Sequence, residues 1–286
     1  MSTEQERKSP LDIEHLGEIE VLLKLGRVLT KAAGGSLPEQ ENIRKVQTLL
    51  DIGCGPGEWV LDVASHYPEK NVQGIDLLEP MIHYAREQAN SQGLENASFL
   101  RMDVHQPLDF PDASFDLINA RNVIGILPTA TWPGLIARCQ RLLRPGGILR
   151  LTEADTWAIT NSAAVHRFYD LFIETFKRSG NWTPRRKKAF CVTPLLNQHL
   201  RNAGFQQVRE RPFHLNFSAG EEGHQAMFQA FRVLFKQYQP VICKMQLATQ
   251  EEINTLYDQV LAEMQASDFC AIAYFLTVWG KMPVTS

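Results

Sequence analysis

The feature that most constrains this chain is a glycine-rich turn that follows a short apolar run. The residues from Leu49 to Glu58 spell L-L-D-I-G-C-G-P-G-E, with three glycines at alternate positions just before a predicted helix. Glycine lets the backbone adopt positive φ and lets a ligand lie directly against the main chain. The first N–H groups of the following helix have no partner within the helix. The segment therefore predicts a ligand-binding turn between a buried strand and a helix.

The spacing of this turn argues against two common nucleotide motifs. A phosphate-binding loop needs Lys followed by Ser or Thr after its last glycine, and both are absent here. The dinucleotide fingerprint G-x-G-x-x-G would need glycine at position 58, which is Glu58. A carboxylate would repel a pyrophosphate. We therefore expect a ligand that presents no phosphate to this turn, and a positively charged group would suit it.

An acidic residue, Asp76, ends the next predicted strand. In open α/β sheets an acid at this place accepts hydrogen bonds from ribose hydroxyls, so we expect a ribose in the ligand. The alternative is that Asp76 caps the helix that follows, because Asp is favoured at that position.

Apolar runs and amphipathic segments alternate along the first half of the chain, which predicts right-handed βαβ units and a parallel sheet. The predicted strands are 46–52, 72–75, 97–102, 115–120 and 148–152, and the predicted helices are 11–29, 59–66, 80–92 and 132–143. The second half is more helical, with helices predicted at 166–178, 194–203, 223–238 and 251–265 and extended segments at 205–217 and 269–279. Ligands of such sheets bind beyond the carboxyl ends of the strands.

Composition narrows the class of protein further. Of 286 residues 44% are hydrophobic, and the net charge of −3 gives no overall attraction to nucleic acid or anionic membrane. No apolar run approaches the roughly 18 residues of a membrane span, and the polar N-terminus lacks the pattern of a secretory signal. The five cysteines are scattered and form no C-x-x-C pair, so no metal site or disulfide framework is indicated. We expect a cytoplasmic protein.

Five segments in order resemble those of the class I S-adenosylmethionine-dependent methyltransferases and cover roughly residues 46 to 155. They are D-I-G-C-G-P-G from Asp51, G-I-D-L-L-E-P-M-I from Gly74, F-L-R-M-D-V from Phe99, F-D-L-I-N-A-R from Phe115 and L-L-R-P-G-G-I-L from Leu142. The resemblance implies an α/β fold with a Rossmann-like, seven-stranded, mostly parallel sheet and helices on both faces. An N-terminal helix and C-terminal helical additions that form a lid complete the expected fold.

The same resemblance implies that the cofactor is S-adenosyl-L-methionine, with S-adenosyl-L-homocysteine as product. Asp51 would hold the cofactor's ammonium, and Asp76 would bind the ribose hydroxyls. Arg121 would lie near the sulfonium or pair with the carboxylate of the cofactor. The full set of implied cofactor-binding residues is Asp51, Gly53, Gly55, Gly57, Asp76, Leu77, Met81, Asp103, Val104, Ala120 and Arg121.

We expect residues 1–286 to form a single methyltransferase domain. Within it, 1–35 would be the N-terminal helix, 46–155 the cofactor-binding core, and 156–286 the substrate or lid helices with the last strands. The N-terminal helix would pack on the core, close the active site or pair with another subunit in a homo-oligomer.

The expected activity is methyl transfer to a small, apolar or aromatic organic acceptor, resembling methyltransferases of quinone and secondary metabolism. The alternatives are a methyltransferase of protein or RNA and a non-catalytic module that only binds the cofactor. A nicotinamide-dependent oxidoreductase is disfavoured by Glu58. The basic run at 183–188 is most simply a solvated loop, and the N-A-R-N segment from Asn119 lacks the [DN]-P-P-[FY] pattern, so no nucleic-acid partner is expected.

Candidate residues for the acceptor side follow the fourth and fifth predicted strands. Glu153 comes directly after the fifth strand and His166 begins an amphipathic helix, and these two are our candidates for catalytic roles. The competing interpretations are a capping carboxylate for Glu153 and a structural histidine for His166. Other candidates are Arg121, Asn122, Asp155, Trp157, Tyr169 and His214.

Overall fold

The computed structural model describes residues 16–40, 43–123, 127, 129–156, 158–178 and 192–284. Its strands are β1 (Thr48–Ile52), β2 (Asn71–Asp76), β3 (Ala97–Arg101), β4 (Phe115–Arg121), β5 (Leu143–Glu153), β6 (Ile159–Thr160), β7 (Gln206–Asn216) and β8 (Ala271–Lys281). Its α-helices are α1 (Leu16–Ala33), α2 (Glu58–His66), α3 (Glu79–Ser91), α4 (Trp132–Leu142), α5 (Ala163–Arg178), α6 (Thr193–Asn202), α7 (His224–Lys244) and α8 (Gln250–Gln265). Two short 3₁₀ helices are η1 (Ile43–Lys45) and η3 (Thr129–Thr131).

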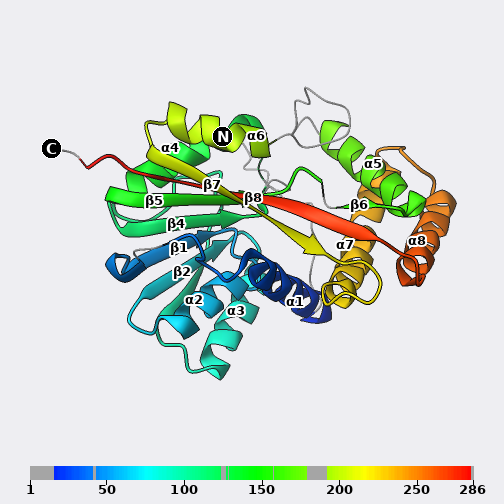
Figure 1. Cartoon of the computed structure of the whole chain (residues 1–286), viewed down its shortest axis with the longest axis horizontal. Coiled ribbons are helices and arrows are strands. Elements are labelled where there is room, and N and C mark those ends of the chain that lie inside the picture. Colours follow the sequence, from blue (N-terminus) through cyan, green and yellow to red (C-terminus); the bar gives the residue numbers. More distant parts are fainter. Residues whose placement is uncertain are drawn as a thin grey trace, which may run out of the picture.

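These strands form one sheet in the order β3-β2-β1-β4-β5-β8-β6, and β7 pairs with β8. The five strands β1 to β5 pair in parallel, while β8 runs antiparallel to its neighbours. In Figure 1, α4 and α6 lie on one face of the sheet, and α2 and α3 lie on the other. The predicted α/β fold with a mostly parallel sheet is confirmed, with eight strands rather than seven because the two-residue β6 is added.

Side-chain alternation in the central strands explains why both faces of the sheet are buried. Leu50 and Ile118 belong to the larger core, which includes α4 and the C-terminal helices. Leu49 and Leu117 belong to the smaller core beneath α2 and α3. Period-two alternation sends successive side chains to opposite faces, so both sets must be apolar in a sheet covered on both sides.

Most predicted element boundaries lie within three residues of those in the structure, but α1 and α7 run on to Ala33 and Lys244, beyond their predicted ends at 29 and 238. The two-residue β6 was not predicted, the predicted helix start at 11–15 lies outside the described residues, and β5 begins earlier than expected. The sequence predicts that the segment from Arg144 to Gly147 ends a helix, but the structure places it inside β5, which begins at Leu143. The register with β4 shifts between the Phe115–Leu143 pair and the Leu117–Ile148 pair. This irregularity accommodates the extra residues, so a turn-forming sequence lies within a strand.

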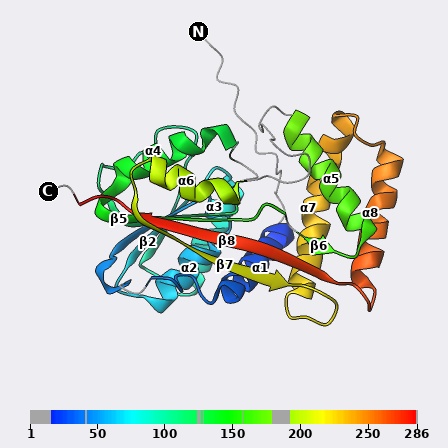
Figure 2. The ribbon, with the colours of Figure 1, turned by 45° about the horizontal axis from the view of Figure 1, so that its top comes forward.

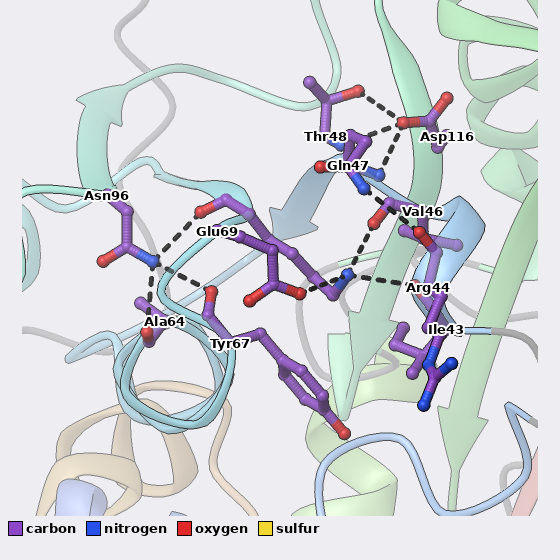
Figure 3. A network of polar contacts seen from close by, with 11 residues as sticks. Ile43, Arg44, Val46, Gln47, Thr48, Ala64, Tyr67, Glu69, Asn96 and Asp116 are labelled. Atoms are coloured by element: carbon purple, nitrogen blue, oxygen red, sulfur yellow. Dashed lines mark hydrogen bonds and ion pairs between the residues drawn. The ribbon is translucent and has the colours of Figure 1, made fainter.

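Two sets of polar contacts, here called clamps, connect the loops at the amino-terminal edge of the sheet. The first is centred on Lys70. The buried Lys70 ammonium donates to the carbonyl oxygens of Ile43 and Val46, at 3.0 and 2.8 Å, and lies 3.0 Å from a carboxylate oxygen of Glu69. Figure 3 shows Asn96, just before β3, donating to backbone carbonyls, with Ala64 and Tyr67 among its partners.

A second clamp at the same edge joins β1 to β4. One Asp116 carboxylate oxygen accepts the backbone N–H groups of Gln47 and Thr48 (Figure 3). Its other oxygen accepts from Arg144 at 2.8 Å. These contacts fix the loops below the sheet, and they lie far along the strands from the glycine turn.

The opposite end of the molecule is helical. Figure 2 shows α5, α7 and α8 grouped together, with β7 and β8 extending toward them from the sheet. Helix α1 lies between the sheet and α7, to which it is tied by a hydrogen bond from Gln237 to Glu18. At its other end Lys31 pairs with Glu222, just before α7. In the part of the chain described here, no helix combines the length and apolarity that a bilayer crossing requires.

Candidate functional site

A cavity of about 270 Å³ lies at the carboxyl ends of β1 and β4. Its wall comes from α1, the turn after β1, the ends of β4 and β5, helix α7 and strand β8. This is the edge where open α/β sheets bind ligands. The apolar part of the wall includes Leu22, Leu25 and Leu29 of α1 and Met227, Phe231 and Leu234 of α7.

The glycine turn forms the floor of this cavity, and its glycines differ in whether they face the cavity or pack against other elements. All three have left-handed backbone: φ is 67° at Gly53, 53° at Gly55 and 85° at Gly57. A Cβ atom on Gly55 would meet nothing within 4 Å, so the space above this residue is open. A Cβ on Gly57 would come within 2.8 Å of Ala85 and Phe99. Gly55 therefore offers bare backbone to a ligand and Gly53 lines the cavity beside it, whereas Gly57 is required for close packing of α2 against α3 and β3.

Asp76 is held against this turn. One carboxylate oxygen accepts the backbone N–H of Gly55 at 2.9 Å, and the other accepts the N–H of Leu78 at 2.9 Å. Burial raises the pKa of the Asp76 carboxyl, and the hydrogen bonds from Leu78 and Gly55 oppose that rise. The contact with Leu78 holds the turn before α3, but Asp76 is not the helix cap that the sequence offers as an alternative, because Leu78 is the N-cap and receives no side-chain cap bond. Each Asp76 oxygen keeps a further lone pair, so this turn leaves acceptor capacity for a ribose.

The residues predicted to surround ribose and adenine lie beside the cavity rather than on its wall. Met81 is buried against Ile19 of α1. One carboxylate oxygen of Asp103 accepts the N–H of His105. The other members of this group are Leu77, which is partly buried, and Val104, which belongs to the larger core. Ala120, which the resemblance places with Arg121 at the methionine end of the cofactor, belongs to the same core.

A buried ion pair connects three elements at the cavity wall. The Arg121 guanidinium, at the end of β4, donates to a Glu58 carboxylate oxygen of α2 at 2.5 Å. The same oxygen accepts from the Thr30 hydroxyl of α1 at 3.0 Å, and Arg121 donates to that hydroxyl at 2.8 Å. Helix α1 is thus joined to the glycine turn and to β4 by a closed set of hydrogen bonds.

Asp51, the last acidic residue before the glycines, is 4% exposed and lies on the same wall. One of its oxygens accepts from the Asn119 amide at 2.7 Å. The other makes no hydrogen bond with any residue that the structure describes. Burial raises the pKa of Asp51 to about 7, while the Asn119 hydrogen bond and the Arg121 charge oppose the shift.

The charges on the cavity wall favour a cation. Two carboxylates, Asp51 and Glu58, face one guanidinium, Arg121, so the group carries one net negative charge when all three are ionised. A negative charge in a site of low dielectric constant is stabilised by a positively charged ligand. The wall also supplies the bare backbone of Gly55. Together these groups suit a ligand with a cationic end that lies along the turn.

Neither predicted catalytic residue lies on the cavity wall. Glu153 is fully buried, and one of its oxygens accepts the N–H of Val123 at 2.8 Å. His166 is exposed on α5, where its ring nitrogen Nε2 lies 2.9 Å from the carbonyl oxygen of Thr160. Glu153 thus caps the loop after β4, and His166 is bonded at the surface, so the structure does not bring them together.

The other acceptor-side candidates divide in the same way. Arg121 and Asn122 line the cavity, and Asn122 has left-handed backbone with φ of 58°. Asp155 accepts two backbone N–H groups, from Val192 and Thr193, which fixes the start of α6. The Tyr169 hydroxyl donates to the Asp155 carbonyl oxygen, and His214 is exposed on β7. Trp157 and the basic run at 183–188 lie outside the described residues.

The sequence alone did not separate the upper wall of the cavity from the core. Met227, Phe231, Leu234 and Tyr238 recur at helical spacing along one face of α7. That spacing is visible in the sequence, but it is equally typical of a helix packed on a core. The hydroxyl of Tyr238, a residue 3% exposed, makes no hydrogen bond within the described part of the chain.

Comparison with known proteins agrees with this geometry. Residues 49–147 match the family model described as a methyltransferase domain. The chain is 24% identical over 192 residues to a demethylmenaquinone methyltransferase of Geobacillus kaustophilus, covering 64% of this chain and 81% of the relative. It is 37% identical over 108 residues to the aklanonic acid methyltransferase DauC of a Streptomyces species, covering 37% of this chain and 48% of the relative. The chain therefore spans less than half the length of that second relative.

A solved structure shows the same fold. The YcgJ protein of Bacillus subtilis superposes with a TM-score of 0.51 at 17% identity, covering 94% of this chain and 99% of that one. The family match spans the strand, glycine turn and acid that form the cavity floor. Residues 49–147 of this chain thus form a methyltransferase domain, and S-adenosyl-L-methionine is its cofactor.

Proposed function

We propose that this protein transfers the methyl group of S-adenosyl-L-methionine to a small, largely apolar or aromatic organic acceptor. The observation that carries the proposal is the composition of the cavity. Its floor is a bare glycine turn with a net negative charge, and its roof is an apolar face of α7. Such a mixture of apolar wall and few polar groups is typical of sites for small organic molecules.

The floor fits the cofactor through the residues already described. The bound cofactor supplies a methyl group on a positively charged sulfur. Asp51, with one oxygen free of hydrogen bonds, would hold its ammonium, and the backbone at Gly53 and Gly55 would lie beneath it. Arg121 would hold the carboxylate, in competition with Glu58.

The ribose and adenine ends would extend from the turn toward β2 and β3. Asp76 would accept from the ribose hydroxyls. The residues proposed to enclose the rest of the nucleoside are Leu77, Met81, Asp103 and Val104, with Gly57 keeping α2 close to this side. Ala120 would lie with Arg121 at the methionine end.

The acceptor would lie between the floor and the roof. Phe231 and Phe275 offer aromatic surface there, and the unpaired hydroxyl of Tyr238 offers one polar group. An apolar ring with a polar substituent matches this wall. Two relatives are named as methyltransferases of demethylmenaquinone and aklanonic acid, which supports an organic acceptor of this size.

The proposed rate enhancement comes from alignment and exclusion of water. Methyl transfer leaves a neutral sulfur, so no residue has to protonate the leaving group. Orientation of two reactants can lower a barrier by about 7–11 kcal/mol in favourable cases. Glu153 and His166 are not included as acid or base in this proposal, because neither side chain reaches the cavity.

The proposal is tested by incubating the protein with methyl-labelled S-adenosyl-L-methionine and a metabolite extract of its host. We expect the label in a small organic product identified by mass spectrometry. A Leu234→Ala variant should bind cofactor normally but yield less product, since Leu234 lines the roof and is only partly buried. Label recovered only in protein or RNA would overturn the small-molecule assignment. Cofactor binding without any labelled product would indicate a binding module.

A further inference from the structure

A row of polar side chains crosses the middle of the sheet beneath α1 and α2. Asp51 on β1, Asn119 on β4 and Arg150 on β5 are paired neighbours in the sheet register. All three are at most 4% exposed. Charged and amide side chains in three adjacent central strands are unusual, because such positions are normally apolar in a covered parallel sheet.

Short hydrogen bonds connect the row from end to end. Asn119 donates to Asp51 at 2.7 Å, and Arg150 donates to the Asn119 carbonyl oxygen at 2.6 Å. Beyond the sheet, Arg150 donates through Nε to Glu39, in the loop after α1, at 2.6 Å. We call Glu39, Arg150, Asn119 and Asp51 the polar row.

The donor and acceptor groups of the polar row fit together in only one orientation of the Asn119 amide. A guanidinium only donates, so Arg150 requires the oxygen of the Asn119 amide to face it. The amide nitrogen must then face Asp51, which can only accept. This arrangement uses one Asp51 oxygen and leaves the other beside the cavity, where no described residue donates to it.

We propose that Glu39, Arg150 and Asn119 are positioning residues that hold Asp51 ionised, with one oxygen turned to the cofactor's ammonium. The inference rests on the proposed role of Asp51 in the preceding subsection. Glu39 neutralises the buried Arg150, and Arg150 prevents the Asn119 amide from turning over. If the amide turned over, its oxygen would face Asp51 and would favour the protonated carboxyl.

The burial of the far pair supports a positioning role. Glu39 and Arg150 have side chains only 3% exposed, and the second Glu39 oxygen has no hydrogen-bond partner among the described residues. A buried ion pair is weak evidence for stability, because desolvation offsets most of its attraction. A pair kept at this cost therefore calls for another role, and fixing the Asn119 amide is the one that its contacts supply.

Other charges also act on Asp51 and must stay unchanged in any test. Arg121 of β4 favours its ionised form, whereas Glu58 of α2 disfavours it. The Cys54 thiol and Asp76 lie near the same turn. From α7 the Tyr238 phenol lines the cavity. None of these groups belongs to the polar row, so the variants below leave them in place.

The test measures the affinity of the intact protein for S-adenosyl-L-homocysteine between pH 6 and 8.5 by calorimetry. Two buffers of different ionisation enthalpy give the number of protons released on binding. The variants are Arg150→Met and the double variant Glu39→Gln with Arg150→Met, which removes both buried charges together. Thr152→Val is the matched control, because it breaks a neighbouring buried hydrogen bond, Thr152 to Thr277 at 2.9 Å, without touching the row.

We expect both row variants to raise the pH midpoint of binding by about one unit, which is about a fivefold loss of affinity at pH 7 that shrinks toward pH 8.5. Thr152→Val should lower Tm without moving that midpoint. A wild-type midpoint in both row variants would overturn the positioning role while leaving Asp51 in the site. An unchanged affinity and pH profile in Asp51→Asn would instead remove Asp51 from the cofactor site, and the positioning role with it.

Discussion

Buried charged groups are fully hydrogen-bonded at the amino-terminal edge of the sheet but only partly hydrogen-bonded at the carboxyl edge. At the amino-terminal edge, the Lys70 ammonium contacts two carbonyls and a carboxylate, and Asp116 accepts from the backbone and from Arg144. At the carboxyl edge, Asp51 has one oxygen without a partner among the described residues, and Gly55 has open space above it.

This difference suggests that the amino edge contributes to the stability of the fold and the carboxyl edge to ligand binding. A buried polar group satisfied by protein atoms holds the fold together, whereas one left unsatisfied costs free energy until a ligand pairs with it. The amino edge should therefore respond to mutation through folding. The carboxyl edge should respond through cofactor affinity and pH.

The largest expected effect is at the amino edge. Lys70→Met removes the donor to Ile43 and Val46 and should lower the free energy of unfolding by about 3–5 kcal/mol, as when one member of a buried charged cluster is removed. Denaturant unfolding measures the change, and the folded variant should keep its affinity for S-adenosyl-L-homocysteine. Lys24→Met, on an exposed pair with Glu20, is the control with little expected effect. Equal losses in the two variants would contradict the clamp.

The second prediction concerns pH at the carboxyl edge. In the ligand-free protein burial raises the pKa of Asp51 to about 7, so the folded state holds a proton that the unfolded chain has already released above about pH 4. The Asp51 contribution to stability is therefore present at low pH and lost as pH rises toward 7.

Asp51→Asn removes this titration. Relative to the wild type, the variant should gain about 2–4 kcal/mol in unfolding free energy between pH 5 and 8, at about 1.4 kcal/mol for each pK unit. It should also bind cofactor more weakly. Parallel stability curves for the two proteins over this range would show that Asp51 is ionised throughout.

The glycine turn contains one position that should affect stability, Gly57, and one that should affect cofactor affinity, Gly55. Gly57→Ala forces a Cβ within 2.8 Å of Ala85 and Phe99 at a positive φ, and should destabilise the fold by about 2–4 kcal/mol. Gly55→Ala meets no atom of the protein, so it should cost less stability and more cofactor affinity. Thermal unfolding and calorimetry on both variants make the comparison, and equal binding losses with equal Tm would refute it.

The smallest expected effect belongs to Asp76. Asp76→Ala should weaken cofactor binding by about 1–3 kcal/mol, the value of a hydrogen-bonded charged group. Because its carboxylate also holds Gly55 and Leu78, Asp76→Asn is the sharper variant, since an amide oxygen still accepts from the backbone. An unchanged dissociation constant in both variants would leave Asp76 only the role of holding the backbone at Gly55 and Leu78.

Local patterns were enough to predict the elements of this fold. The apolar run before Gly53 and the alternation of strands with helices depend on neighbours in the chain, and the structure reproduces them. The same reasoning assigned Glu153 and His166 to the acceptor side from their positions after a strand and at a helix start. It failed to place them because the direction of a side chain depends on what packs around it.

The sequence by itself determined the fold class and the glycine turn, because strand propensity and glycine backbone freedom are properties of short segments. The cofactor followed from the resemblance of five such segments to a known family. Asp51, Asn119 and Arg150 are visible in the sequence as polar residues inside apolar strands. Only the tertiary structure decided that they form one row, that Glu39 ends it, and that α1 and α7 roof the cavity. Those contacts join residues far apart in the chain, and their formation depends on strand register and helix packing that no local pattern specifies.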